Sequence, residues 1–289
     1  MNKVSKKTFD QILARLEGLP SLPVTVAAIL EVLNNPESSA QELSEALSYE
    51  QSLASRVLKL VNSAYYGFPR RIDTLSKAVT ILGYNSIRNI ILVTSIFDSL
   101  DKGSKARSLD RKGFWQHALG CGAAAQVMGT KLGFRQGEEL FLAGLLHDIG
   151  KVILDAFLHE EYSQVLKVCQ EENLLLFEAE EQVLGVTHED FGCWLAETWN
   201  LPYNLTEAIS HHHEPPESKE YFIITSLVHI GDILTRALEV GHGGDDLIPA
   251  INRQAWVALK LNPAFLQDLI EDFENKLQQA QDFMPDNSC

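Results

Sequence analysis

The sequence has few cysteines, few prolines and no apolar run of the length that crosses a membrane. Its four cysteines, Cys121, Cys169, Cys193 and Cys289, form no CxxC pair, so no disulfide framework or cysteine-rich metal site is indicated. The first residues, MNKVSKKTFDQIL, lack the apolar segment of a secretory signal. No stretch reaches the roughly 18 consecutive apolar residues of a membrane helix. These absences predict a protein of the reducing cytoplasm that does not bind a membrane.

Positive charge is also scarce. The chain has 24 Lys and Arg against 39 Asp and Glu, which gives a net charge of -15. The first 100 residues carry 10 basic and 9 acidic side chains, whereas the remaining residues carry 14 and 30. Because phosphate backbones are neutralised by clustered Lys and Arg, the second part of the chain is not expected to bind nucleic acid. The asymmetry also favours two structural units.

Apolar residues are abundant, at 45% of the 289 positions, and suffice for a sizeable core. They recur at spacings of three and four almost everywhere, and no stretch alternates with period two for long. This pattern predicts an all-α fold. A helix start is indicated at Ser39-Ala-Gln-Glu42, where serine and glutamate can cap each other's amides. The polar segment between Asp98 and Arg111 indicates a connection, so we predict two helical subdomains, residues 1–104 and 105–289.

Charged residues interrupt one apolar segment, LAGLLHDIGKVIL, which spans residues 142–154. On a helix, His147 and Asp148 would point about a third of a turn apart, and Lys151 would return to the face of His147. An imidazole nitrogen beside a carboxylate oxygen suits Zn, Fe or Mn. A buried histidine and aspartate can also simply hydrogen-bond each other, so the pair alone does not establish a metal site.

Further candidates lie in the same part of the chain. His117 lies in GFWQHALGCGAAAQVMG, among small residues, and Asp232 interrupts the apolar SLVHIGDILTRAL. An unpaired buried carboxylate is costly and normally finds a cation. His188 begins THEDFGCWLAETW, and His212 and His213 precede a double proline. These three histidines also have a simpler interpretation, as polar residues at helix ends, where imidazolium complements the helix dipole at the C-terminus.

The order of these residues resembles a known pattern. His117, His147-Asp148 and Asp232 resemble the H…HD…D signature of the HD superfamily of metal-dependent phosphohydrolases, which are all-helical proteins. Upstream, LPSLPVTVAAILEVL and LASRVLKLVNSAYYGFPRRIDTLSKAVTILGYNSIRNIIL resemble the HDOD domain, an HD-related module of bacterial signalling proteins. One departure is the segment Ser48-Tyr49-Glu50-Gln51, where many relatives have an Asp-Pro pair. The resemblance implies that the second subdomain is an HD-superfamily helical bundle.

The resemblance also implies a set of site residues. Matched to the related HD-GYP phosphodiesterases, the chain keeps counterparts of seven metal ligands: His117, His147, Asp148, His188, His212, His213 and Asp232. It also keeps the lysine, Lys151, which the family assigns to a phosphate oxygen or to proton transfer. One or two divalent ions, Fe, Mn or Zn, are therefore expected, with Lys151 and Asp148 as catalytic residues. The loop HHHEPPESKEY lacks the Gly-Tyr-Pro motif, which argues against hydrolysis of a cyclic dinucleotide.

Two functions remain open from the sequence. Many HDOD domains are thought to have lost the metal site and to act as regulatory modules that bind protein partners. The family and the missing Gly-Tyr-Pro loop favour such a signal-transduction module, with a signalling protein as the partner, and this is our main expectation. The retained ligand set favours the alternative, an active metal-dependent phosphohydrolase that cleaves a nucleotide or phosphodiester. The aromatic segment Tyr65-Tyr66-Gly67-Phe68-Pro69 is either a partner anchor or a packed loop.

Overall fold

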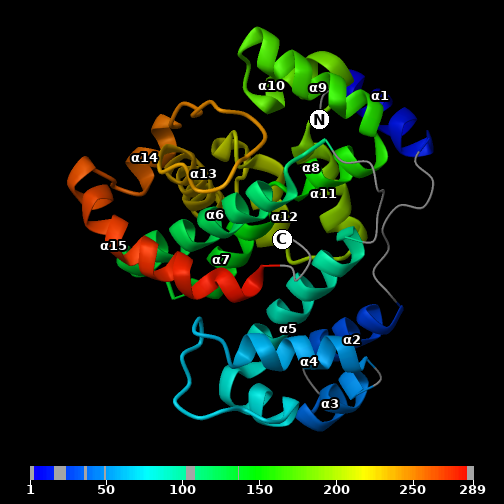
Figure 1. The fold of residues 1–289 in the computed structure, drawn as a ribbon, viewed down its shortest axis with the longest axis vertical. Coiled ribbons are helices and arrows are strands. Elements are labelled where there is room, and N and C mark those ends of the chain that lie inside the picture. Colours follow the sequence, from blue (N-terminus) through cyan, green and yellow to red (C-terminus); the bar gives the residue numbers. More distant parts are fainter. Residues whose placement is uncertain are drawn as a thin grey trace. The chain divides into compact units, whose positions relative to one another are not determined.

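A computed structural model describes residues 3–15, 24–35, 38–48, 50–101, 108–135 and 137–284. Within these ranges the chain forms helices and no strands, so the predicted all-α fold is confirmed (Figure 1). The described residues form two compact units. The small unit contains residues 24–101 and 278–284, and the large unit contains residues 3–15 and 108–277.

These units are not a simple division of the chain. The predicted boundary between residues 104 and 105 falls in residues 102–107, outside the described residues. Helix α1 (Lys3–Arg15) belongs to the large unit, where the rings of Phe9 and Phe191 lie 4.9 Å apart. The 3-10 turn η2 (Gln281–Phe283) belongs to the small unit, where Phe283 packs 4.9 Å from the ring of Tyr65. These aromatic contacts join each of the two segments to residues far away in the sequence.

The small unit consists of α2 (Val24–Asn34), α3 (Ala40–Ser48), α4 (Gln51–Val61), α5 (Leu75–Asp101) and η2. Helix α3 starts at the predicted capping box: the amide of Ser39 donates to Oε2 of Glu42 at 2.7 Å, and the amide of Glu42 donates to Oγ of Ser39 at 3.2 Å. In α5, residues Leu75–Ile96 are long and apolar enough to span a membrane, but 61% of the most apolar window is buried in the protein. Core helices show the same property.

Small residues allow the helices of the large unit to pack closely. Helix α6 (Arg111–Lys131) is buried along most of its length and packs against α7 (Gly137–Leu146) and α13 (Phe222–Ala237). A Cβ atom at Gly122 would collide with the carbonyl of Phe141, and one at Gly144 would collide with the backbone of Gly122. The run of glycines and alanines in α6 therefore allows close backbone contact, which encloses His117.

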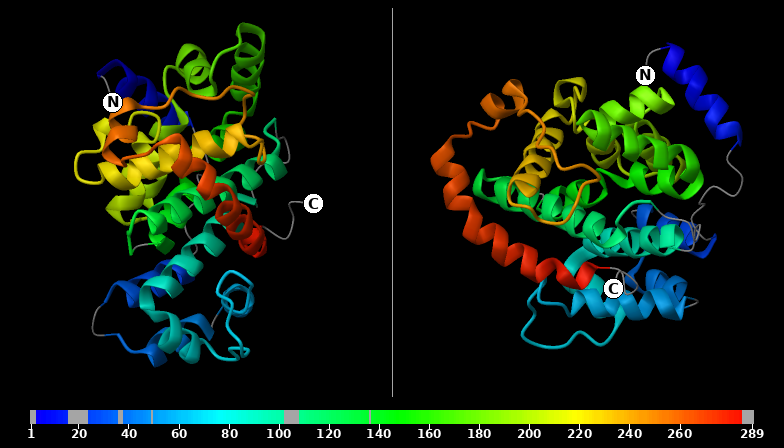
Figure 2. Two further views of the ribbon diagram at one scale, coloured as in Figure 1. Left: turned by 90° about the vertical axis from the view of Figure 1, so that its left-hand side faces the viewer. Right: turned by 45° about the horizontal axis from the view of Figure 1, so that its top comes forward.

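The remaining helices surround this centre (Figures 1 and 2). They are α8 (Ile149–Phe157), α9 (His159–Glu172), α10 (Leu176–Leu184), α11 (His188–Thr198), α12 (Tyr203–His211), η1 (Pro215–Glu217), α14 (Arg253–Ala258) and α15 (Pro263–Ala280), of which residues 278–280 belong to the small unit. Helices α9 and α10 pack together as a hairpin at one edge of the large unit (Figure 1). A loop, residues 239–252, connects α13 to α14; we call it the covering loop.

Candidate metal centre

His147 and Asp148 occupy a two-residue turn between α7 and α8, and not the middle of one helix as expected. Gly144 and Gly150 flank the turn, and the backbone of α6 and the carbonyl of His188 approach them so closely that no Cβ would fit. This close approach breaks the helix and buries both side chains completely, at 0% and 1% exposure. The turn thereby directs both groups into one enclosed space.

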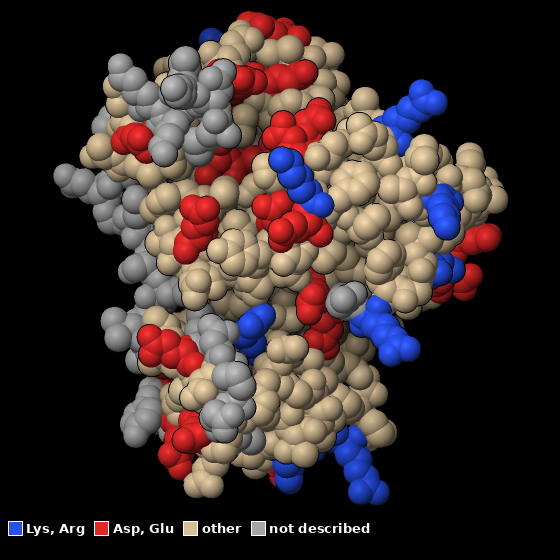
Figure 3. Space-filling model, turned by 180° about the vertical axis from the view of Figure 1, so that it is seen from behind, with Lys and Arg blue, Asp and Glu red and all other residues tan. Residues whose placement is uncertain are grey.

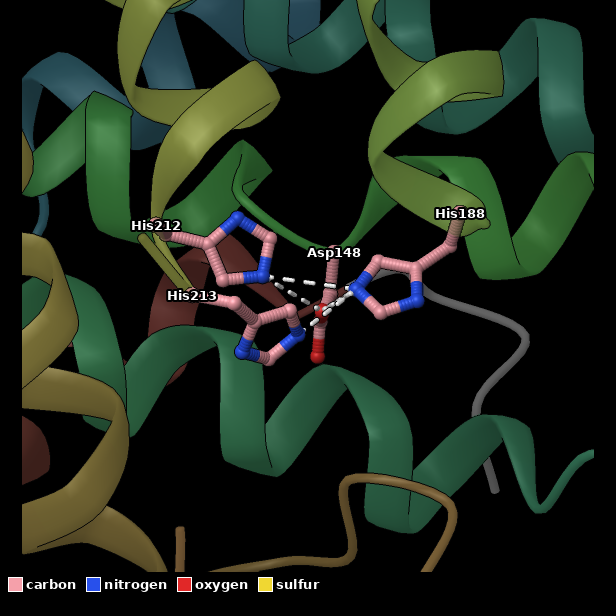
Figure 4. A group of neighbouring side chains, drawn as sticks. All are labelled: Asp148, His188, His212 and His213. Carbon is pink, nitrogen blue, oxygen red and sulfur yellow. Dashed lines mark hydrogen bonds and ion pairs between the residues drawn. The ribbon is translucent and has the colours of Figure 1, made fainter. Parts of the chain in front are cut away.

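Asp148 lies between two groups of histidines. On one side, its Oδ1 lies 3.2 Å from Nε2 of His188 and 3.5 Å from Nε2 of His212, and His213 joins this group (Figure 4). On the other side, its Oδ2 lies 3.2 Å from Nε2 of His147 and 3.6 Å from Nε2 of His117. Six of the seven predicted ligands therefore form two adjoining groups that share one carboxylate.

Asp232, the seventh predicted ligand, lies at the edge of the His117 group. Its Oδ1 is 3.0 Å from Nε2 of His117 and 3.9 Å from Nε2 of His147. The same oxygen accepts a hydrogen bond of 2.9 Å from Nε of Arg236, one helical turn later. Burial alone would raise the pKa of Asp232, but the charge of Arg236 holds it well below its usual range. The cation that this buried carboxylate requires is therefore Arg236, which sequence reasoning missed although DILTR places it at i+4.

Hydrogen bonds fix the orientation of the imidazole rings. Nδ1 of His147 lies 2.6 Å from the carbonyl of Gly144, and Nδ1 of His212 lies 3.1 Å from the carbonyl of Ile209. A carbonyl can only accept, so each Nδ1 carries a proton and each Nε2 is left facing Asp148. His229 bonds the carbonyl of His212 through Nδ1 and accepts from a backbone amide through Nε2, so both of its nitrogens are occupied. It supports the centre without being a candidate ligand.

The donor set fits a divalent metal ion. Nε2 of His188 faces Nε2 of His212 at 3.3 Å and Nε2 of His213 at 3.1 Å. Within the described part of the chain, Nε2 of His147 and Oδ1 of Asp148 are buried without a hydrogen-bond partner. Nitrogen and oxygen atoms of this kind that converge in a dry interior are costly unless protons or a metal cation lie between them, and a divalent ion can meet that need. Burial lowers the pKa of His212 to about 3, so this ring stays neutral, as a ligand must.

Lys151 is fully buried and already has two acceptors. Its Nζ donates to Oδ2 of Asp148 at 2.7 Å and to the carbonyl of Gly243 in the covering loop at 2.8 Å. The loop is held against α6, because the amide of His242 donates to the carbonyl of Gly113 at 2.8 Å. Arg236 joins the loop to Asp232, since its Nη1 also donates to Oδ1 of Asp245 at 2.8 Å. The glycine-rich run GHGGDD was the sequence signal for this closure, and sequence reasoning did not use it.

Charge on the surface follows the composition. On the face seen in Figure 3, acidic side chains form several groups, whereas lysine and arginine side chains are scattered. The described residues on that face show no continuous basic patch. A nucleic acid would find no row of cations on this face to neutralise its phosphates.

Comparisons with known proteins find a matching family model and similar solved structures. The family model of the HDOD domain matches residues 19–215. A crystal structure of an HDOD domain protein of unknown function from Geobacter sulfurreducens has a TM-score of 0.78 and 26% identity, and the match covers 98% of this chain and 99% of that one. A protein from Shewanella amazonensis, described as a candidate phosphohydrolase, shares the fold with a TM-score of 0.68 and 23% identity, over 94% of each chain.

A longer relative is known from sequence. An uncharacterised protein of Treponema pallidum is 27% identical over 237 residues, which is 81% of this chain. The chain spans only 45% of the length of that relative.

Proposed function

Because the chain belongs to the HDOD domain family, which is related to the HD superfamily of metal-dependent phosphohydrolases, we propose that it is a signal-transduction module whose large unit holds a divalent metal ion in a closed centre. In this proposal the protein acts in the cytoplasm on a signalling protein partner, and not on nucleic acid or a membrane. The three described cysteines are free thiols, as a reducing compartment allows.

The observation that carries this proposal is the burial of the centre. His117, His147, Asp148, His188, His212 and Asp232 have exposures of 0–1%, and only His213 is partly exposed. Catalytic metal sites keep an open position for substrate, whereas structural sites are closed by protein ligands. Lys151 has no contact with solvent and its ammonium group already donates to two acceptors, so a phosphate oxygen could reach it only if the surrounding residues moved. This closed arrangement favours a regulatory module over an open enzyme.

The small unit is the candidate surface for the protein partner. Tyr65 is buried against Phe283, which makes it a packing residue. Tyr66 and Phe68 are partly exposed and stack with nearly parallel rings, 1° apart in angle. Rigid aromatic side chains are frequent anchors of protein interfaces. We therefore assign the partner contact to Tyr66 and Phe68.

The second candidate function is a metal-dependent phosphohydrolase acting on a nucleotide or phosphodiester. It is favoured by one observation, the position of Asp148 between two ligand groups. Divalent ions bound to such ligands polarise a phosphoryl oxygen and lower the pKa of water. For this function the covering loop has to release Lys151, whose ammonium group then binds a phosphate oxygen. His117, His147 and Asp232 would hold one ion, His188, His212 and His213 a second, and Asp148 both.

The test combines elemental analysis with a hydrolysis assay. Protein purified without added metal is expected to contain close to one equivalent or more of Fe, Mn or Zn, and His147→Ala is expected to lose it. His211→Ala is the matched control, because its side chain is 28% exposed and outside both groups. A metal content near zero in the wild-type protein, unchanged in His147→Ala, would refute the metal centre. Hydrolysis of bis-p-nitrophenyl phosphate that is lost in Lys151→Met would instead establish the second candidate.

A further inference from the structure

Glu180, on α10, is a fully buried carboxylate outside the predicted ligand set. Its Oε2 accepts hydrogen bonds from Nδ1 of His188 at 2.6 Å and from the backbone amide of His188 at 2.8 Å. Its Oε1 accepts a hydrogen bond from the hydroxyl of Tyr162, on α9, at 3.1 Å. Both oxygens are therefore engaged, and two of the three bonds hold His188.

These bonds determine which nitrogen His188 offers to the centre. A carboxylate can only accept, so Nδ1 of His188 carries a proton and Nε2 faces Oδ1 of Asp148 at 3.2 Å. A carboxylate behind a histidine ligand is a frequent arrangement in metal proteins, where it fixes the ring and makes it a stronger donor. The second bond, to the backbone amide, fixes the first residue of α11 as well as the ring.

The same carboxylate connects the centre to the α9–α10 hairpin. Tyr162 and Glu180 are fully buried, and they join the two helices of the hairpin across their interface. The contact with His188 then extends this chain of hydrogen bonds to the metal ligands. We propose that Glu180 is a positioning residue that holds Nε2 of His188 toward the metal and couples metal occupancy to the α9–α10 hairpin; this inference rests on the proposed function.

Coupling of this kind is reciprocal. If the hairpin holds Glu180 in the position that orients His188, metal binding stabilises the hairpin by the same factor by which the ordered hairpin strengthens metal binding. A change in metal occupancy at the buried centre would then change the stability of α9 and α10, which lie at the edge of the large unit (Figure 1). A signalling module can use such a surface to report whether the ion is bound.

The test measures zinc affinity and amide hydrogen exchange on the full chain. Metal-free protein is titrated with Zn²⁺ in competition with a chromophoric chelator, and exchange in residues 159–184 is followed with and without Zn²⁺. Glu180→Gln keeps the shape but removes the charge, and it is expected to weaken zinc binding about 10-fold or more. Glu181→Gln is the matched control, because it makes the same change one residue later on an exposed side chain. Its affinity should equal that of the wild type.

Hydrogen exchange separates positioning from general stability. In the wild type and in Glu181→Gln, zinc should slow exchange throughout residues 159–184, and Glu180→Gln should lose this protection. Tyr162→Phe removes only the hydroxyl on Oε1, so its loss of affinity should lie between those of the two glutamine variants. If circular dichroism shows that Glu180→Gln does not fold, Tyr162→Phe still tests the role of Glu180.

The outcomes distinguish the inference from the proposed function. If the wild-type protein binds no Zn²⁺, Fe or Mn, the metal centre itself is refuted. If the wild type binds zinc but Glu180→Gln and Tyr162→Phe bind it as tightly as Glu181→Gln does, only the role of Glu180 is overturned. Zinc-dependent protection that is absent from residues 159–184 in the wild type would overturn the coupling.

Discussion

Replacing Asp148 with asparagine should destabilise the large unit strongly even without metal. Its carboxylate is 1% exposed and is the anionic partner of Lys151, whose ammonium group is fully buried. In Asp148→Asn this ammonium group still has acceptors, the carbonyl of Gly243 and the new amide oxygen, but it has no counter-ion. Breaking a buried ion pair by removing one partner costs about 3–5 kcal/mol. That is a large share of the roughly 5–15 kcal/mol by which a domain is stable.

A double variant isolates this cause. Asp148→Asn with Lys151→Met removes the unpaired charge, and replacing both partners of a buried pair is often nearly neutral. The double variant should therefore recover about 2 kcal/mol or more relative to Asp148→Asn alone.

Urea unfolding in EDTA, followed by tryptophan fluorescence, measures these free energies. All four tryptophans, Trp115, Trp194, Trp199 and Trp256, lie in the large unit, so the signal reports that unit alone. The reasoning fails if Asp148→Asn unfolds within about 1 kcal/mol of the wild type, or if the double variant is no more stable than the single one.

Two further predictions concern the pH dependence of the centre and its closure. Burial opposes protonation of His188, but Glu180 outweighs it and raises the pKa of His188 to about 9. Zinc must displace this proton, so its apparent affinity should rise by at least about tenfold per pH unit up to about pH 9. Chelator competition from pH 6.5 to 9.5 measures the slope, and a flat profile would contradict the pairing. Gly241→Ala should speed the release of zinc measured with excess EDTA, because a Cβ at Gly241, whose φ is 68°, would collide with the backbone at His117 and Gly113. Gly133→Ala is the control, since Gly133 also has a positive φ but lies in open space; equal release rates in both variants would show that closeness to α6 does not matter.

The fold class could be predicted because helices leave local patterns, and a single sequence displays such patterns directly. Helical spacing and the capping box at Ser39 depend on residues three or four apart, and both are present in the structure. The order of His117, the His147-Asp148 pair and Asp232 led to the HD superfamily, and the upstream segments beginning LPSLPVTVAAILEVL led to the HDOD domain, which the family match confirms.

The groups that surround the ligands were not predicted, because they depend on contacts between distant segments. Glu180 is eight residues before His188 and looks like an ordinary helix glutamate in LFEAEEQVL. The carbonyl of Gly243 accepts a hydrogen bond from Lys151, which lies 92 positions earlier in the sequence. The helical placement of His147 and Asp148 failed for a similar reason, since the backbone of α11 packs against Gly150 and imposes the turn. Whether the seven ligands hold metal stays a prediction.

The covering loop has a consequence for when an ion enters the protein. Gly243 binds Lys151, and the loop is hydrogen-bonded to α6 and to Arg236, so in the proposed metal centre an ion beside Lys151 is expected to exchange when these contacts open. The proposed ion would then leave at the rate at which the loop opens, however tightly its ligands bind it. Occupancy of such a centre would follow a change in the metal supply with a delay set by the loop and not by the affinity of the ligands.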